Sequence, residues 1–363
     1  MPAALEGLVV VDFSRVLAGP LVGMTLGDLG ADVLKIESPD GDDTRRWGPP
    51  FDDDGGATYF NAANRNKRSV VLDLRRDDDR ASARELCERA DVVVANFRPG
   101  TLERFGLDYA SVSRQNARVV YCEVTGFGEG KGRDLPGYDP LAQALGGLMS
   151  ITGPPETPSK TGVAIVDVVA GLYATIAVLA ALRERESSGR GQRVTINLLH
   201  TALAALANQA TGYLASGEVP ARLGNDHPSI APFATYRAAD GDLMIGAGND
   251  RQFASLCDAI GARGAAADPR FADNAARVRH AAELRAVIER QLAARSCDEW
   301  TEILREAGVS AGPVQDVGAA FALAERLGLD VVDDFDGVRT VRFPAALSRT
   351  PARTRRRPPL RDT

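Results

Sequence analysis

The sequence predicts an α/β protein with an open, doubly wound parallel sheet and a second, smaller α+β domain. Three observations predict this class. Short runs rich in β-branched residues recur through the first third of the chain, amphipathic stretches separate several of them, and a region rich in glycine and proline precedes a different pattern of hairpin and helices. Strand–helix–strand alternation is typical of parallel sheets, because parallel neighbours need a crossover connection. A length of 363 residues also favours two domains.

The strand candidates of the larger domain are short and mostly apolar. Three consecutive valines in Asp91–Phe97 are typical of a strand that is covered on both faces. The stretch Asp77–Ala90 begins with acidic residues, as the positive end of a helix prefers. The predicted strands are Leu8–Phe13, Asp32–Glu37, Ser69–Leu74, Asp91–Phe97, Arg118–Val124 and Arg193–Asn197.

One apolar stretch, Val163–Leu182, has the length of a membrane span. It contains Asp167, and an aspartate at the centre of a bilayer costs roughly 2.5–3.5 kcal/mol. We therefore predict a buried helix of a soluble protein and no membrane association. The single acid near the start of an apolar helix then needs another explanation.

The second domain is predicted after a helix at Leu198–Ala215 and the glycine- and proline-rich stretch Gly217–Pro232. Gly312 and Pro313 predict the return of the chain to the first domain. The second domain should contain a hairpin of Phe233–Ala238 with Leu243–Ile245 and helices at Asp250–Ile260, Val278–Ala294 and Cys297–Ala307. The predicted boundaries are 1–200 with 313–363 for the large domain, 201–221 for a linker, 222–310 for the small domain and 311–312 for the return.

Composition excludes several classes of function. The net charge of −6 disfavours a nucleic-acid partner, which usually selects a basic face. The four cysteines are far apart, so we predict reduced core residues and no zinc site, and the three histidines lack metal-ligand spacing. The N-terminus has no basic segment before its apolar run, so we expect a cytoplasmic protein.

A glycine-rich loop, Gly126–Gly132, follows a predicted strand but fits no phosphate-loop pattern. Lys131 stands where the dinucleotide fingerprint needs its last glycine, and Thr125 stands where a Walker A loop needs its first. A nicotinamide-dependent dehydrogenase is therefore disfavoured. Backbone N–H groups of Gly126 and Gly128 remain candidates for stabilising an oxyanion.

Several segments, in order along the chain, resemble the class III CoA-transferase (CaiB/BaiF) family. They include LEGLVVVDFSRVLAGPLVGMTLGDLGADVLKIESP, NRNKRSVVLDL, ADVVVANFRPGTLERFGLDY and VTGFGEGKGRDLPGYDPLAQALGGLMSITG, followed later by GQRVTINLL, AGVSAGPV and RPPL. The matches extend from about residue 5 to 360. The resemblance implies a Rossmann-like large domain, a ring-shaped subunit and an interlocked homodimer. It also implies acyl-CoA and small carboxylic acids as substrates, with no permanently bound cofactor.

The resemblance implies that Asp167 is the nucleophile, because it matches the aspartate that opens the long helix in the family. A carboxylate can attack an acyl-CoA thioester to give a mixed anhydride, which the released CoA thiolate converts to an aspartyl thioester. The attacking carboxyl group must be ionised. A pKa raised by ~2 units would leave most of it ionised at pH 7, and the helix N-terminus should favour the anion.

Further site residues are implied by the same family. They include the segment around Val16 and Leu17, the Asn96–Arg98 motif, Arg104 and Tyr138. The full set of CoA-binding candidates is Val16, Leu17, Lys67, Arg68, Asn96, Phe97, Arg98, Arg104 and Tyr138. Gly246 and Gly248 match a glycine-rich run of the family and are added to the oxyanion candidates.

The chain also departs from formyl-CoA transferases, which are members of the family. Leu17 replaces a glutamine and Pro136 replaces a lysine, so formyl or oxalyl substrates are disfavoured and a less polar acyl group is favoured. Two alternatives stay open. An acyl-CoA racemase would need two proton carriers, yet Tyr138 stands where racemases have a histidine. A non-catalytic CoA-binding protein is the other.

Overall fold

The computed structural model describes residues 3–360, which divide into two compact units. Within the described chain, the first unit comprises residues 3–149, 160–219 and 330–360, and the second comprises residues 150–159 and 220–329. The return to the first unit therefore comes later than residue 313, where the sequence pattern placed it. The short segment 150–159 had also been expected in the first unit.

The first unit contains a six-stranded sheet in which every neighbouring pair is parallel. The predicted α/β class with an open parallel sheet is thus confirmed. The strand order is β3-β2-β1-β4-β5-β6, so the chain builds outward from β1 in one direction and then from β4 in the other. The strands are β1 (Val9–Asp12), β2 (Asp32–Glu37), β3 (Lys67–Val71), β4 (Val92–Ala95), β5 (Val120–Thr125) and β6 (Arg193–Asn197).

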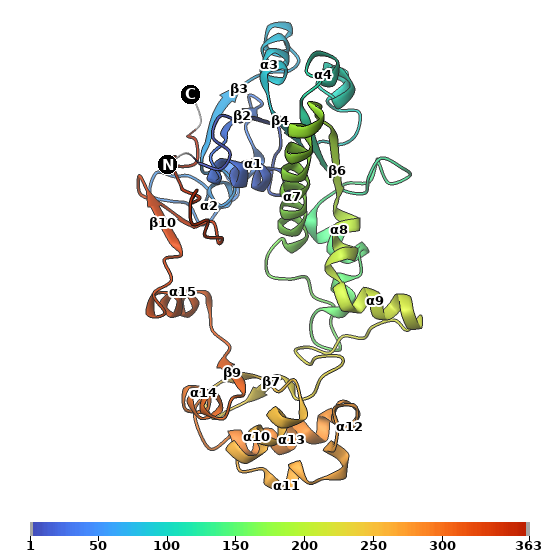
Figure 1. The fold of residues 1–363 in the computed structure, drawn as a ribbon, viewed down its shortest axis with the longest axis vertical. Coiled ribbons are helices and arrows are strands. Elements are labelled where there is room, and N and C mark those ends of the chain that lie inside the picture. Colours follow the sequence, from blue (N-terminus) through green and yellow to red (C-terminus); the bar gives the residue numbers. More distant parts are fainter. Residues whose placement is uncertain (1–2, 361–363) are drawn as a thin grey trace. The chain divides into compact units, whose positions relative to one another are not determined.

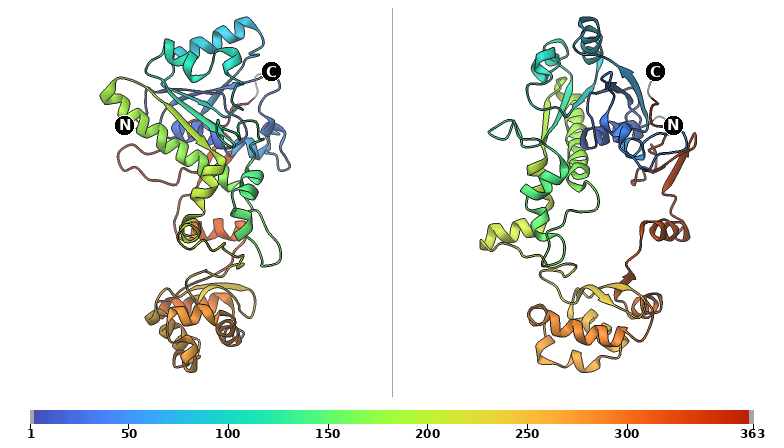
Figure 2. Two further views of the ribbon diagram at one scale, coloured as in Figure 1. Left: turned by 90° about the vertical axis from the view of Figure 1, so that its right-hand side faces the viewer. Right: turned by 180° about the vertical axis from the view of Figure 1, so that it is seen from behind.

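Helices cover both faces of this sheet (Figures 1 and 2). Helix α1 (Ala18–Asp28) and helix α7 (Ile165–Ser188) bury one face, while α3 (Asp77–Arg89) and α4 (Tyr109–Gln115) bury the other. Helices α1 and α7 approach closely at Gly171, where a Cβ atom would stand 2.9 Å from the carbonyl oxygen of Ala18. Both faces of the central strands are therefore apolar, as the valine runs predicted.

Helix α7 explains the long apolar stretch of the sequence. It is the one helix of residues 3–360 with the length and hydropathy to cross a bilayer. Residues of one face, among them Val166, Ala170, Ala174 and Val178, are buried in the core against α1 and the sheet. The spacing of these residues follows the helical repeat, as expected of a helix that packs on a core.

The remaining elements of this part of the chain are short. The single helix predicted at Leu198–Ala215 is broken, because Ala207 has a φ of 44° and cannot continue a right-handed helix. The further elements are α2 (Thr58–Asn61), α5 (Asp139–Leu145), α6 (Leu148–Ile151), α8 (Leu198–Ala205), α9 (Ala207–Ser216), the 3₁₀ turns η1 (Asp43–Arg46) and η2 (Glu103–Phe105), and a hairpin of β10 (Val332–Phe335) with β11 (Val338–Val341).

The second unit has an antiparallel sheet of β7 (Phe233–Arg237), β8 (Asp242–Gly246) and β9 (Ser310–Pro313). The segment around Gly312 and Pro313 is thus a strand paired with β8, and its interpretation as the return crossing was wrong. The helix predicted at Val278–Ala294 is interrupted at His280. The helices are α10 (Asp250–Ala259), α11 (Arg263–Ala266), α12 (Asn274–Arg279), α13 (Ala281–Leu292), α14 (Cys297–Glu306) and α15 (Val317–Arg326), with the 3₁₀ turn η3 (Pro269–Phe271).

The four cysteines are buried and unpaired, as their wide spacing predicted. Burial raises the pKa of the Cys87 and Cys122 thiols to about 12. Thiols with such pKa values carry almost no thiolate at neutral pH, so these residues act as small apolar side chains of the core.

Candidate active site

The strand order places a crevice between β1 and β4, where the chain reverses the direction in which it builds the sheet. Open parallel sheets bind ligands at this point, outside the carboxyl ends of the strands. A hollow of about 410 Å³ lies there and belongs entirely to the first unit. Its lining includes Val16, Leu17, Asn96, Phe97, Arg98, Gly126, Gly128, Tyr138 and Asp167, all of which the sequence had singled out.

The loop after β1 is held against the loop after β4 by one side chain. The carboxamide oxygen of Asn96 accepts the Arg15 N–H at 2.8 Å, and its NH₂ group donates to the Arg15 carbonyl at 2.6 Å. The next residue, Val16, has a φ of 71°, which is strained for a β-branched residue. In this conformation the Val16 N–H donates to the Asp42 carboxylate at 3.3 Å.

Two buried lysine–aspartate pairs lie under the same loop. Lys35 Nζ donates to Asp42 at 2.9 Å and to the Ser14 carbonyl at 2.8 Å. Lys67 Nζ donates to Asp12 at 2.8 Å, to the Pro20 carbonyl at 2.8 Å and to Asn64 at 2.9 Å. The Lys67 side chain has no exposed surface, so its ammonium group cannot meet a CoA phosphate in this structure. We therefore correct its role from ligand binding to support of the loop after β1.

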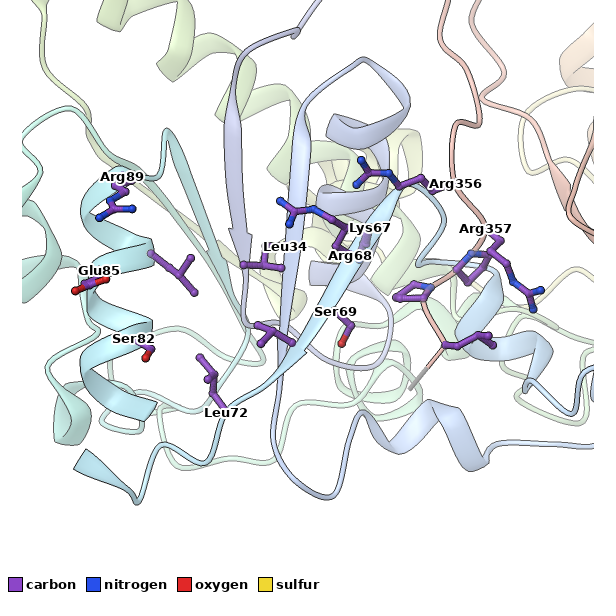
Figure 3. A pocket seen from close by; sticks show the side chains of 15 residues that line it. Leu34, Lys67, Arg68, Ser69, Leu72, Ser82, Glu85, Arg89, Arg356 and Arg357 are labelled. Carbon is purple, nitrogen blue, oxygen red and sulfur yellow. The ribbon is translucent and has the colours of Figure 1, made fainter. Parts of the chain in front are cut away.

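Arg68 also lies away from the switch-point hollow. Its side chain is about half exposed and pairs with Asp32 at 2.6 Å. Figure 3 shows it beside a second hollow of about 830 Å³, between β3, α3 and the Arg356–Leu360 segment. The two hollows share no lining residue.

Three other predicted positions stand outside the lining of the switch-point hollow. Arg104 is exposed on the η2 turn that follows the Asn96–Thr101 loop. Gly246 and Gly248 belong to the second unit. The Gly248 N–H donates to the Gln252 carboxamide at 2.9 Å, so it already has a partner.

Asp167 occupies the first turn of α7, and its side chain lies at the hollow while 8% of the residue is exposed. Among the hydrogen bonds and ion pairs of residues 3–360, none involves its carboxylate. Burial, and then the nearby charge of Asp139, raise the pKa of Asp167 to about 7. The ionised fraction at neutral pH is therefore about one half, smaller than the sequence-based expectation. The helix N-terminus does not offset burial here.

Asp139 explains why the N-terminus of α7 leaves Asp167 without donors. Its Oδ1 accepts the N–H groups of Val166 at 2.8 Å and of Asp167 at 3.2 Å, so a residue from α5 caps α7. Its Oδ2 accepts the Gln143 NH₂ group at 2.6 Å. Gln143 in turn accepts the Thr161 N–H at 2.9 Å, in the segment that leads into α7.

The opposite wall of the hollow is the glycine-rich loop after β5. Gly126 and Gly137 approach so closely that a Cβ atom on Gly126 would stand 2.5 Å from the Gly137 Cα. This contact brings Tyr138, the N-cap residue of α5, to the hollow. The Gly128 N–H donates to the Thr125 hydroxyl at 3.2 Å, so it already has a partner. Of the two predicted oxyanion donors in this loop, the Gly126 N–H is the one that remains a candidate.

Sequence reasoning missed three residues at or near the hollow. Arg15 and Arg133 line the hollow together with the predicted Arg98. Tyr59 lies close enough that burial and then the charge of Asp167 raise the pKa of its phenol. Arg15 could have been found from the switch-point rule, which applies to the whole loop after β1. No comparable rule singles out Arg133 or Tyr59 from their positions in the sequence.

No group of three or more histidine, cysteine or acidic side chains within residues 3–360 is arranged to hold a metal ion. The hollow holds a buried carboxylate with a pKa near neutrality, and its lining also includes three exposed arginines and the Tyr138 phenol. Such a carboxylate can act as a nucleophile or as an acid–base group.

Comparisons with known proteins point to one family. The family model described as CoA-transferase family III matches residues 5–363. The chain is 42% identical to the succinate–glutarate CoA-transferase of Agrobacterium fabrum, over 98% of this chain and 92% of that protein. It is 37% identical to the acetyl-CoA:oxalate CoA-transferase of Acetobacter aceti, over 94% and 89%. The crystal structure of a CAIB/BAIF family protein from Brucella suis is 44% identical and superposes with a TM-score of 0.90, over 99% and 97% of the two chains.

Proposed function

This chain belongs to CoA-transferase family III and is a CoA-transferase, and we propose that it moves CoA between carboxylic acids through covalent intermediates on Asp167. The observation that carries the proposal is the Asp167 carboxylate itself. It is nearly buried, has no hydrogen-bond partner within residues 3–360, and lies at a hollow lined by Arg15, Arg98 and Arg133. An unpaired carboxylate is costly to bury, which favours a functional reason for its position.

The proposed reaction has four balanced steps. An Asp167 oxygen attacks the thioester carbonyl of the donor, the C–S bond breaks, and CoA leaves as a thiolate from a mixed anhydride. The thiolate then attacks the Asp167 carbonyl carbon, which releases the donor acid as a carboxylate and forms an aspartyl thioester. The acceptor carboxylate attacks this thioester and displaces the CoA thiolate. The thiolate finally attacks the acceptor carbonyl of the new anhydride, which frees the Asp167 carboxylate.

We propose that at least one of the acids is a dicarboxylic acid. Relatives with close similarity are named for succinate, glutarate and oxalate, all of which carry a second carboxylate. Arg15, Arg98 and Arg133 at the hollow offer more cationic groups than one pyrophosphate needs, and arginine binds carboxylates in a bidentate geometry. The apolar Leu17 favours a methylene chain over the shorter oxalate.

A matrix of acyl-CoA donors and acid acceptors tests this function. Succinyl-, glutaryl-, acetyl- and butyryl-CoA would each be incubated with succinate, glutarate, oxalate and butyrate, and the acyl-CoA products measured by mass spectrometry. We expect transfer between succinyl-CoA and glutarate. Exchange of the α-proton in deuterated water without any transfer would instead indicate a racemase.

Substitution of Arg98 with alanine is expected to raise the KM for acyl-CoA by about tenfold, which corresponds to ~1.4 kcal/mol. The reason is that Arg98 is an exposed cation at the hollow, suited to a CoA phosphate. The KM should rise equally for every acyl group, and Arg104→Ala should behave alike. Arg183→Ala, an exposed cation of α7 paired with Glu186, is the control. A KM effect restricted to dicarboxylic acyl groups would assign Arg98 to the acid instead.

We also propose a homodimer in the cytoplasm, interlocked as the family resemblance implies. The support is an exposed apolar face on α7, opposite its buried face, formed by Leu172, Tyr173 and Ile176. Ile176 is 61% exposed in the single chain. Exposed apolar patches commonly mark protein interfaces.

Ile176→Glu should therefore lower the dimer fraction, because it would bury a charge at this face. Sedimentation velocity at micromolar and nanomolar concentrations measures it. Wild type should sediment as a dimer of twice 38.5 kDa at both concentrations. Glu184→Ala, an exposed change near the end of the same helix, should leave the dimer intact. A wild-type monomer at nanomolar concentration would contradict the interlocked arrangement.

A further inference from the structure

Asp139 is a buried carboxylate that the reaction described above does not use. The residue is 3% exposed and follows Tyr138 directly, at the start of α5. Its two oxygens accept the hydrogen bonds from Val166, Asp167 and Gln143 that were described above. No basic side chain is among these partners. Asp139 therefore places a second acid beside the N-terminus of the helix that carries Asp167.

We propose that Asp139 is a positioning residue that anchors the first turn of α7 and opposes the ionised form of Asp167 with the negative charge of its carboxylate. This inference rests on the proposed nucleophilic role of Asp167 and concerns the same site. By accepting the Val166 and Asp167 N–H groups, Asp139 withdraws from Asp167 the donors that a helix N-terminus would otherwise offer. Asp167 is thus left with a poorly stabilised, more basic carboxylate.

The consequence is a bias toward the covalent intermediates. In the free enzyme, Asp139 and an ionised Asp167 are two negative charges at one helix end. In the mixed anhydride and in the aspartyl thioester, Asp167 is uncharged, so this repulsion is absent. Formation of the acyl–enzyme relieves an unfavourable interaction, and only interactions that differ between the two states can promote the step.

Arg15, Arg98 and Arg133 line the same hollow as Asp167, but the charge to which the pKa of Asp167 responds is that of Asp139. On α1 the acid Asp28 lies at the far end and pairs with Arg65 at 2.6 Å, while Glu123 on β5 is paired with Arg193 on β6. The remaining titratable groups on neighbouring elements are His200 on α8, Tyr59 on α2 and Tyr138 at the start of α5. Besides burial, Asp139 is the group whose charge raises the pKa of Asp167.

Two substitutions of Asp139 distinguish its hydrogen bonds to the first turn of α7 from the effect of its negative charge. Asp139→Asn keeps an oxygen for the Val166 and Asp167 N–H groups and removes the charge, whereas Asp139→Ala removes both. We expect the acid limb of kcat/KM to move about one pH unit lower in Asp139→Asn, since one unit corresponds to a tenfold change in relative ionisation. The covalently acylated fraction, trapped with hydroxylamine, should fall about tenfold. Asp139→Ala should show the same shift with a lower melting temperature.

Matched variants guard against trivial explanations. Asp108→Asn changes another capping aspartate, which accepts the Ala110 N–H at 3.1 Å, and should leave the pH profile unchanged. In Asp139→Asn the new NH₂ group would face the Gln143 NH₂ group. Asp139→Ser avoids this clash, because its hydroxyl oxygen is a neutral acceptor for the helix N–H groups and for Gln143. If Asp139→Asn does not fold, Asp139→Ser should fold and still show the lowered acid limb.

The outcomes distinguish this inference from the proposed function. An acid limb that stays within about 0.2 pH unit of wild type in Asp139→Asn, with unchanged hydroxamate yield at Asp167, would overturn the positioning role but leave the nucleophile intact. A hydroxamate that forms on another acid in wild type would refute the proposed function itself. A lowered limb together with a lowered hydroxamate yield at Asp167 supports both.

Discussion

Replacing Asp167 with alanine is expected to reduce CoA transfer by at least ~10³-fold, which corresponds to ~4 kcal/mol of transition-state stabilisation. Alanine removes the carboxylate that would attack the thioester. The loops that would bind CoA, after β1 and β4, are held by Asn96 and Asp42 and do not depend on Asp167. Calorimetric titration should therefore show CoA binding within about threefold of wild type, while the transfer rate is lost.

Asp167→Asn should be as inactive as Asp167→Ala and yet more stable than wild type at pH 8. The pKa of Asp167 is raised from 3.8 to about 7, chiefly by burial. A carboxyl group whose folded pKa lies above its unfolded pKa contributes stability at low pH that is lost as the pH rises through the folded pKa. Above pH 7 the wild type therefore carries a buried, unpaired anion, which the neutral amide removes. Melting temperatures at pH 5 and pH 8 measure the difference.

The same pKa sets the pH dependence of the wild-type reaction. Because the ionised form attacks, kcat/KM should rise as the pH increases through about 7 and then level off. Hydroxylamine trapping should give a hydroxamate in the peptide that contains Asp167. Full activity in Asp167→Ala, or an acid limb near pH 4, would show that this carboxylate is not the nucleophile.

The fold was predictable because its signals are local and repeated. Runs such as the three valines of β4 predict strands buried on both faces, and their alternation with helices predicts a parallel sheet. The boundary between the units was less predictable. The sequence of β9 contains a glycine and a proline, which predict a turn. The segment forms a strand because it pairs with β8. Pairing between distant segments is a tertiary effect that local propensity does not carry.

Much of the switch-point hollow was predicted from the family resemblance, and most of those residues lie in loops after the carboxyl ends of strands, where open parallel sheets bind ligands. Asp139 could not be predicted, since its role depends on a contact across 27 residues to Val166. Lys67 and Arg68 were predicted as a pair, but side chains of successive residues in a strand point to opposite faces. On β3 one of them enters the core and the other reaches solvent. Adjacent cations in a strand are therefore poor candidates for one shared anion.

This contrast leads to the second large effect that we expect. Lys67→Met should destabilise the protein by about 3–5 kcal/mol, because it leaves Asp12 as an uncompensated buried charge. The ammonium group also bonds the Pro20 carbonyl and Asn64, so α1 and the segment before β3 lose a shared anchor. Urea unfolding, followed by circular dichroism and compared with wild type, measures the loss.

Two companion variants decide between a structural and a ligand-binding role for Lys67. Arg68→Ala removes an exposed cation whose pair with Asp32 is about half exposed, and should change stability by less than ~0.5 kcal/mol. Asp12→Asn in the Lys67→Met background removes the unpaired charge and should recover part of the lost stability. At temperatures where Lys67→Met remains folded, its KM for acyl-CoA should stay within about threefold of wild type, because no part of the Lys67 side chain reaches the surface. A stable Lys67→Met enzyme with a strongly raised KM would instead return Lys67 to the CoA phosphates and would require β3 to present both cations to one ligand.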